Sequence, residues 1–194
     1  MTFNLPSATT RRAVIKTASR TLSLAGVAML INGGVTAAYA SAASETAEQD
    51  LGILNAAIAL EHEGIAAYQI AATSGLLKPA IVELGIIFQG HHKGHRDILT
   101  KAVRNLGGEP TAEKSLKEYA ADLDASSLSS QEDVLRLALK LERGAANAYL
   151  GLIPALTADY HQVAAQMAGD EAFHAAILGN ALGEAIPSSA LLFG

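Results

Sequence analysis

The 194-residue sequence contains no cysteine. Disulfide bonds and thiolate metal ligands are therefore excluded, and any metal site must be built from nitrogen and oxygen donors. Three common motifs are also absent from the sequence: a Walker loop, a Rossmann glycine fingerprint and a nucleophile elbow. The chemistry that these motifs mark, which includes nucleotide binding and serine-dependent hydrolysis, therefore has no support in this chain.

The N-terminal segment lacks an apolar run long enough to hold the chain in a membrane. Its longest run, Leu22–Ile31, is too short to span a bilayer as a stable anchor. The preceding segment Thr10–Lys16 (TRRAVIK) resembles the twin-arginine export signature, and Ala38–Ala40 (AYA) offers the small-x-small pattern that signal peptidase reads. Residues 1–40 are therefore predicted to be a twin-arginine-type signal peptide. The expected partners are the twin-arginine export machinery and signal peptidase, and the expected location is the periplasm.

A single membrane anchor is the alternative interpretation of this segment, but the short apolar run and the cleavage pattern favour export. Cleavage would leave no stable membrane anchor. The resemblance to the twin-arginine signature also implies export in the folded state, often with a cofactor already inserted. An exported metalloprotein would suit that route.

Positive charge is scarce in the predicted mature domain, residues 41–194. Four of the 14 Lys and Arg residues lie in the signal segment, which holds no Asp or Glu. Ten basic residues therefore remain against 19 acidic ones, a formal charge of −9. This acidity argues against nucleic acid and anionic membrane surfaces as partners, and it is compatible with cation binding. The remaining length of about 150 residues suffices for one domain with one core.

Runs of β-branched residues are few, while Ala and Leu recur with helical periodicity in four long segments. We predict helices at about residues 48–73, 79–106, 130–151 and 157–182. Pro79 is a favoured residue in the first turn of the second helix, and Ser129 or Ser130 can cap the third. The periodicity therefore predicts an all-α fold.

The connections between these helices predict their arrangement. The first and third connections are a few residues long, so each joins an antiparallel hairpin. The second connection, residues 107–129, is long enough to return along the whole bundle, with room for a short helix around Ala112–Leu123. We therefore predict a four-helix bundle of two antiparallel hairpins joined by a long crossover. A short tail follows, in which Leu191, Leu192 and Phe193 are able to pack.

The stretch Gly169–Leu178 (GDEAFHAAIL) places Glu171 and His174 three residues apart in an apolar, Ala-rich run. Residues three apart on a helix share a face, so this carboxylate and this imidazole point the same way. The second helix holds a matching pair, His92 and His95. Glu-x-x-His on an inward helix face is a ligand pair of metal sites in four-helix bundles.

The two halves of the mature domain are related by an internal repeat. The motif Leu-Glu-x6-Tyr occurs twice, 81 residues apart, with its acids and tyrosines at Glu61 and Tyr68 and at Glu142 and Tyr149. The two His motifs, each followed by Ile-Leu, recur at an offset of 79. Shared Ala- and Leu-rich composition is the alternative explanation, but the matching letters are Glu, Tyr and His. The tyrosines are expected to pack in the core with hydrogen-bonded hydroxyls, and a role beside a metal is the alternative.

Each acid of the repeat lies in the middle of an apolar stripe. Glu61 shares its helix face with Ile58, and Glu142 shares its face with Leu139. For either acid alone, a position at the edge of the stripe, in contact with water, would be the simplest interpretation. For two acids together with two matched motifs on the other helices, metal ligation is favoured, because bound cations offset buried carboxylates.

With these motifs the chain resembles the ferritin-like superfamily, in particular small exported bacterial ferritin-like domain proteins, over about residues 48–183. The family pattern has Glu on the first and third helices and Glu-x-x-His on the second and fourth. The resemblance implies a metal site formed by Glu61, His92, His95, Glu142, Glu171 and His174. It also implies a divalent metal, iron in the first place with manganese or zinc as alternatives. The resemblance further implies an oxidase or ferroxidase activity that uses dioxygen or peroxide. It is also compatible with a homo-oligomer.

His92 departs from this pattern, which has a glutamate at that position. Three carboxylates leave two divalent ions under-neutralised by one charge relative to the four-carboxylate version, unless hydroxide or oxide bridges them. His91 is an alternative ligand, because His91 and His95 are also spaced to share a face. The departure keeps a second function open, a non-catalytic structural or stress-related four-helix module. His62 is expected to be solvated or at the rim, since it points about 100° away from Glu61.

Overall fold

The computed structural model describes residues 42–193, and the expected signal peptide lies outside the described residues. Within that range every regular element is helical. The four long helices are α3 (Ala42–Thr73), α4 (Pro79–Asn105), α6 (Gln131–Leu152) and α7 (Ala158–Ala181). The shorter elements are the α-helix α5 (Leu116–Asp122) and the 3-10 turns η2 (Ala125–Ser127) and η3 (Ile153–Ala155). In the described range no helix combines the length and the hydrophobicity needed to cross a membrane.

Local sequence explains where the helices begin and end. Pro79 stands at the first position of α4, and Ser130 caps α6 by accepting a hydrogen bond from the backbone N–H of Asp133. Gly107 and Gly183 adopt positive φ angles of 79° and 70° just beyond α4 and α7, a conformation that glycine reaches without steric cost. These three helices begin and end within one residue of the ranges read from the sequence. By contrast, α3 begins six residues earlier, because no Pro or Gly interrupts the segment before it.

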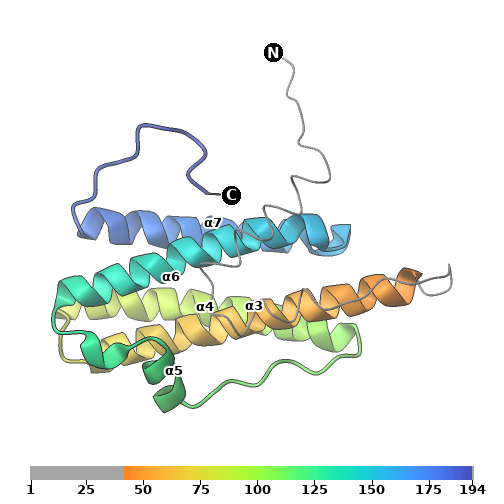
Figure 1. Cartoon of the computed structure of the whole chain (residues 1–194), viewed down its shortest axis with the longest axis horizontal. Coiled ribbons are helices and arrows are strands. Elements are labelled where there is room, and N and C mark those ends of the chain that lie inside the picture. Colours follow the sequence, from red (N-terminus) through yellow and green to blue (C-terminus); the bar gives the residue numbers. More distant parts are fainter. Residues whose placement is uncertain (1–41, 194) are drawn as a thin grey trace.

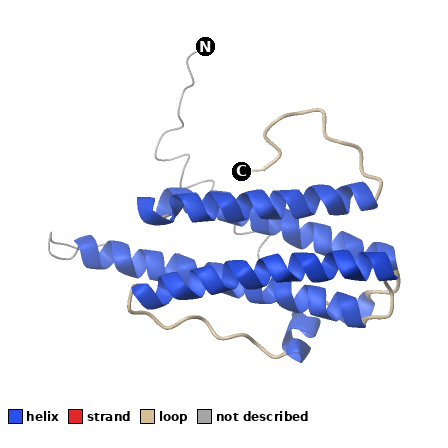
Figure 2. Cartoon of the chain, turned by 180° about the vertical axis from the view of Figure 1, so that it is seen from behind, coloured by secondary structure: helices blue, strands red, loops and turns tan. Residues whose placement is uncertain are grey.

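The four long helices form two antiparallel hairpins, α3 with α4 and α6 with α7 (Figure 1). Packing is extensive within each hairpin and much sparser between α3 and α6 or between α4 and α7. The crossover from α4 to α6 returns along the bundle and places α5 against α3 (Figures 1 and 2). The predicted all-α bundle of two hairpins joined by a long crossover is thus confirmed.

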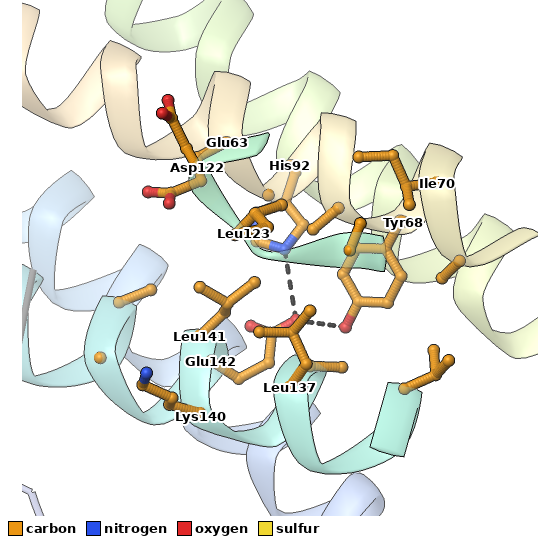
Figure 3. Close-up of a pocket in the computed structure, with 18 of the residues that line it drawn as sticks. Glu63, Tyr68, Ile70, His92, Asp122, Leu123, Leu137, Lys140, Leu141 and Glu142 are labelled. Carbon is orange, nitrogen blue, oxygen red and sulfur yellow. Dashed lines mark hydrogen bonds and ion pairs between the residues drawn. The ribbon is translucent and has the colours of Figure 1, made fainter. Parts of the chain in front are cut away.

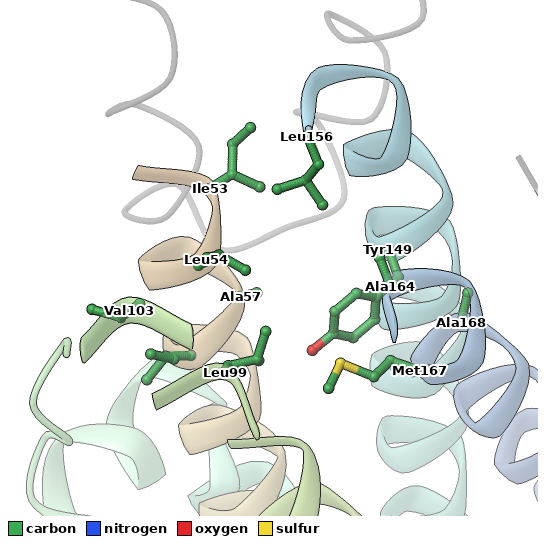
Figure 4. Close-up of a cluster of buried hydrophobic side chains, with 11 residues drawn as sticks. Ile53, Leu54, Ala57, Leu99, Val103, Tyr149, Leu156, Ala164, Met167 and Ala168 are labelled. Carbon is green, nitrogen blue, oxygen red and sulfur yellow. The ribbon is translucent and has the colours of Figure 1, made fainter. Parts of the chain in front are cut away.

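Two apolar clusters fill the bundle, one toward each end. The first is built on Ile53, Leu54, Ile58, Leu99, Val103, Tyr149 and Met167 (Figure 4). The second is built on Tyr68, Phe88, Leu135, Leu139, Ala175 and Leu178. Along every long helix, the buried glutamates and histidines of the predicted site lie between the positions that feed these two clusters. The apolar ends therefore hold a polar layer in the middle of the bundle.

Of the three apolar residues of the C-terminal tail that were expected to be able to pack, only Phe193 contacts the bundle core. Phe193 lies against the second cluster, whereas Leu191 is 97% exposed and Leu192 is also exposed. An ion pair between Glu184 and Arg143 of α6, at 2.6 Å, holds the start of the tail against the bundle.

Asp50 is a buried aspartate of α3 that caps the start of α7. Its carboxylate accepts hydrogen bonds from the backbone N–H of Thr157 (2.9 Å) and from the Thr157 hydroxyl (2.6 Å). We expect Asp50→Ala to lower the free energy of unfolding by about 1–2 kcal/mol, because both donors lose their partner. The melting temperature should fall by roughly 2–8 °C. The control is Asp97→Ala, which removes an exposed aspartate bonded to its neighbour Arg96. Equal melting temperatures for the two variants would contradict the prediction.

Candidate metal centre

The six side chains that the sequence singled out as ligands all lie buried in the middle of the bundle. Their exposed fractions range from 0% to 6%. They form two overlapping groups, and within each group one nitrogen or oxygen atom from every residue lies within 4.8 Å of the others. The first group is Glu61, His92, His95 and Glu171, and the second is His92, Glu142, Glu171 and His174.

His92 belongs to both groups because its two ring nitrogens face opposite sides. Its Nδ1 lies 2.8 Å from Oε2 of Glu61, and its Nε2 lies 3.3 Å from Oε1 of Glu142. One nitrogen of an imidazole cannot bridge two ions as a carboxylate does. Here, however, each nitrogen faces a different half of the site, so His92, at the position where the family pattern has a glutamate, reaches both halves. The exposed neighbour His91 enters neither group.

Glu171 is the second shared residue, and its two oxygens also face opposite halves. Oε1 lies 3.0 Å from Nδ1 of His95, and Oε2 lies 3.3 Å from Nδ1 of His174. The Oε2 atom is fully buried and has no hydrogen-bond partner. A buried carboxylate oxygen that lacks a hydrogen bond is costly even with an imidazole nearby, and a bound cation would reduce that cost. Nitrogen and oxygen donors without sulfur therefore fit a divalent metal at this position.

The outer nitrogens of two histidines are held by residues at the edge of the site. Nε2 of His95 donates to Oδ2 of Asp170 at 3.1 Å, and Nε2 of His174 lies 2.9 Å from Nδ1 of His91. Partial burial and the nearby charge of His174 lower the pKa of His91. Metal-ligating histidines are oriented by such outer partners. Sequence reasoning missed both partners, although each directly precedes a residue of the site.

Two tyrosines tie the hairpins together through the site carboxylates. The Tyr68 hydroxyl of α3 donates to Oε1 of Glu142 on α6, and the Tyr149 hydroxyl of α6 donates to Oε1 of Glu61 on α3. Burial, together with the adjacent glutamate, raises the pKa of each tyrosine, so both remain protonated donors. The expectation of core tyrosines with hydrogen-bonded hydroxyls is confirmed, and their partners are the site glutamates themselves.

The site groups neutralise one another when no metal is bound. Burial by itself raises the pKa of Glu61 and Glu142, but their hydrogen bonds to histidines outweigh it and hold both pKa values below the usual range. Burial lowers the pKa of His95, but hydrogen bonds to Glu171 and Glu61 raise it to about 10. The pKa values of His92 and His174 are raised by their glutamate partners in the same way. For Glu171, burial dominates and raises the pKa of the carboxyl.

Gly64 lets α3 and α4 approach closely beside the site. A Cβ at this position would lie 3.0 Å from Nδ1 and Cε1 of His92. We therefore expect Gly64→Ala to displace the His92 ring, to lower metal affinity by roughly tenfold and to cost about 1–3 kcal/mol of stability. Metal titration and thermal melting of the variant would measure both effects.

The matched control for this prediction is Gly52→Ala on the same helix, where an added Cβ meets no atom within 4 Å. Alanine at such an open helical position should leave metal affinity unchanged and stabilise the protein by up to about 1 kcal/mol. If Gly64→Ala behaved like Gly52→Ala, the close approach to His92 would not matter for the site.

His62 is buried, contrary to the expectation of a solvated or rim position. Its Nε2 donates to the carbonyl of Thr111 at 3.2 Å. Thr111 belongs to the crossover and also bonds Asn55, which lies about two turns before His62 on α3. The crossover therefore covers this face of α3, and helical periodicity alone does not reveal that cover.

Residues 49–184 match the ferritin-like domain family. Among solved structures, the chain is similar to a conserved hypothetical protein, rv2844, from Mycobacterium tuberculosis. The two share 25% sequence identity with a TM-score of 0.59, over 74% of this chain and 97% of the mycobacterial chain. No curated protein matches the chain.

Proposed function

The chain belongs to the ferritin-like domain family, and on this premise we propose that it is an exported metalloprotein that binds two divalent ions and oxidises iron with dioxygen or peroxide. The observation that carries the proposal is the pair of buried ligand groups that share His92 and Glu171. Iron is the first candidate, and manganese or zinc would also suit a nitrogen and oxygen donor set. The twin-arginine-like segment Thr10–Lys16 supports export to the periplasm.

Each residue of the site has a definite part in this proposal. Glu61 and His95 would hold one ion, and Glu142 and His174 would hold the other. The two shared residues would each contribute to both ions. Bound iron would supply the redox chemistry, since it can pass electrons to an oxidant and act as a Lewis acid.

The surrounding residues would keep the ligands in place. The two tyrosine hydroxyls fix Oε1 of each outer glutamate, and the second oxygen of each faces a histidine of the site, His92 for Glu61 and His174 for Glu142. Asp170 and His91 fix the outer nitrogens of His95 and His174, so that Nδ1 of each ring points into the site. This arrangement orients the donors before any ion arrives.

A non-catalytic four-helix module is the second candidate function. The observation that favours it is the ion-pair network of the site: three carboxylates and three imidazoles form hydrogen bonds and ion pairs with one another. A network of this kind can be retained for stability and specificity without a metal.

Metal analysis distinguishes the two candidates. Residues 41–194 would be purified without a chelating tag, incubated anaerobically with ferrous, manganous or zinc ions, desalted and analysed for metal. Two equivalents of metal support the proposal, one indicates a mononuclear variant, and none favours the structural module. Adding dioxygen to the ferrous form and following ferric absorbance and oxygen consumption would then test oxidation.

A further inference from the structure

A cavity of about 440 Å³ lies between α3 and α6, close to α5 and the η2 turn (Figure 3). Most of its wall is aliphatic and comes from both hairpins and the crossover, with Leu60, Ala67, Ile70, Leu123, Leu137 and Leu141 among its lining residues. This volume lies within the usual range of small-molecule sites in proteins. The sparse packing between α3 and α6 leaves the space, and small residues on both helices, such as Ala67 and Ala145, keep it open.

The inner end of the cavity is the candidate metal centre itself. Tyr68, His92 and Glu142 line it, and in Figure 3 the tyrosine and the histidine converge on the glutamate. A molecule in the cavity would therefore touch groups of the site directly. The side chains at this end already bond one another, so they offer no free charge to a ligand.

Three of the charged side chains that line the cavity, Asp122, Asp124 and Lys140, lie at exposed positions. Asp122 bonds Lys114 at 2.8 Å, and burial raises the pKa of Glu63, which disfavours its charged form. An ionised ligand would lose its hydration in the aliphatic interior, and the exposed charges of the wall remain in water, where they attract it only weakly. An uncharged ligand loses little and gains apolar burial.

We propose that this cavity binds an uncharged, predominantly aliphatic small molecule with one end against His92 and Glu142. Binding requires no metal. The additional inference that such a molecule is an organic substrate, held beside the metal, rests on the proposed function.

The experiment uses metal-free residues 41–194 with methyl-labelled Leu and Ile, titrated with octan-1-ol, octanoate and octylamine. Octanol is expected to shift the methyl signals of Leu137 and Leu141 in a saturable manner, and the two charged probes should bind at least tenfold more weakly. Ala145→Leu, which fills the cavity from α6, should weaken octanol binding at least tenfold. The control Ala56→Leu alters a half-buried alanine of α3 outside the cavity wall and should leave binding unchanged.

Three results would overturn the inference: no saturable shift with octanol, binding that Ala145→Leu leaves intact, or tighter binding of either charged probe. If Ala145→Leu fails to fold by circular dichroism, Ala67→Leu fills the same space from α3.

The experiments distinguish failure of the cavity proposal from failure of the proposed function. A protein that binds two metal ions but no octanol would keep the proposed function and lose the cavity ligand, and one that binds octanol but no metal would do the reverse.

Discussion

Glu171→Gln is expected to abolish the binding of both metal ions, from two equivalents to none. Glu171 is the one carboxylate that belongs to both ligand groups, and each of its oxygens faces a different half. Glutamine keeps the shape of the side chain but removes the negative charge and turns one ligand oxygen into a donor amide. One half of the site then loses its ligand oxygen and both halves lose the negative charge, so metal affinity should fall more than the roughly 10–100-fold caused by changes in outer partners. Equilibrium dialysis followed by metal analysis measures both stoichiometry and affinity.

Asp170→Asn is the matched control for this experiment. The residue is adjacent in sequence, its side chain is 59% exposed, and it contacts the site only through Nε2 of His95. This change should weaken binding about tenfold and leave the stoichiometry at two. Two tightly bound ions in Glu171→Gln would refute the assignment of Glu171 as the shared ligand.

The stability of metal-free Glu171→Gln separates loss of ligation from loss of fold. Burial raises the pKa of Glu171, so the charged carboxylate is held against its preference. The metal-free variant should therefore melt at the same temperature as the parent chain or higher at neutral pH. A large fall in melting temperature would mean instead that Glu171 is required for folding.

The metal-free protein is expected to lose stability as the pH rises above 6.5, and metal is expected to restore it. The folded-state pKa values of His92, His95 and His174 lie above the ordinary value of 6.5, and that of His95 is about 10. A raised histidine pKa contributes stability fully below 6.5, and the contribution is lost as the pH rises through the folded value. Because one pKa unit equals about 1.4 kcal/mol, the loss should reach several kcal/mol by pH 10.

At acidic pH, two of the glutamates change the stability of the metal-free protein in the opposite direction. The lowered pKa values of Glu61 and Glu142 contribute stability that is present above the ordinary 4.5 and lost as the pH falls through the folded values. The metal-free protein should therefore be most stable between about pH 4.5 and 6.5. Alkaline solution removes the imidazolium protons and leaves buried carboxylates without a counter-charge.

Metal affinity should depend on pH in the opposite direction to the stability of the metal-free protein. An ion must displace protons from the imidazoles, so it binds more tightly as the pH rises. The increase in melting temperature on adding manganous ion should be larger at pH 8.5 than at pH 5.5, measured anaerobically by calorimetry. A metal-free melting temperature that is flat or rises between pH 6.5 and 9, or a metal effect that is larger at pH 5.5, would contradict the predicted charge state of the site.

The sequence was sufficient to predict the bundle and its buried glutamates and histidines because both depend on local spacing. Helical periodicity defines the long helices, and the capping serine and the positive-φ glycines limit them. Short and long connections then determine which helices pair. Glu-x-x-His and His-x-x-His each project two side chains from one face of a helix. The repeated glutamates Glu61 and Glu142 lie at the same level of the bundle on the other two long helices. The burial of all six residues follows from those spacings.

Side-chain contacts between separate helices could not be predicted from local spacing. The bond from Tyr68 to Glu142 joins residues 74 apart, and that from Tyr149 to Glu61 joins residues 88 apart. Such contacts depend on how far each helix is rotated and shifted along its axis, and the packing of the two apolar clusters determines both. The burial of His62 under the crossover escaped prediction for the same reason.

The amino-acid sequence by itself therefore determined the four helices, their pairing, and the residue types that reach the centre of the bundle, because periodicity, capping and loop length act over short distances. Only the tertiary structure decided that His92 faces both halves of the site, that His91 and Asp170 orient the other histidines, and that an aliphatic cavity ends at His92. Those features arise where side chains from separate helices meet, and their geometry is fixed by packing across the bundle.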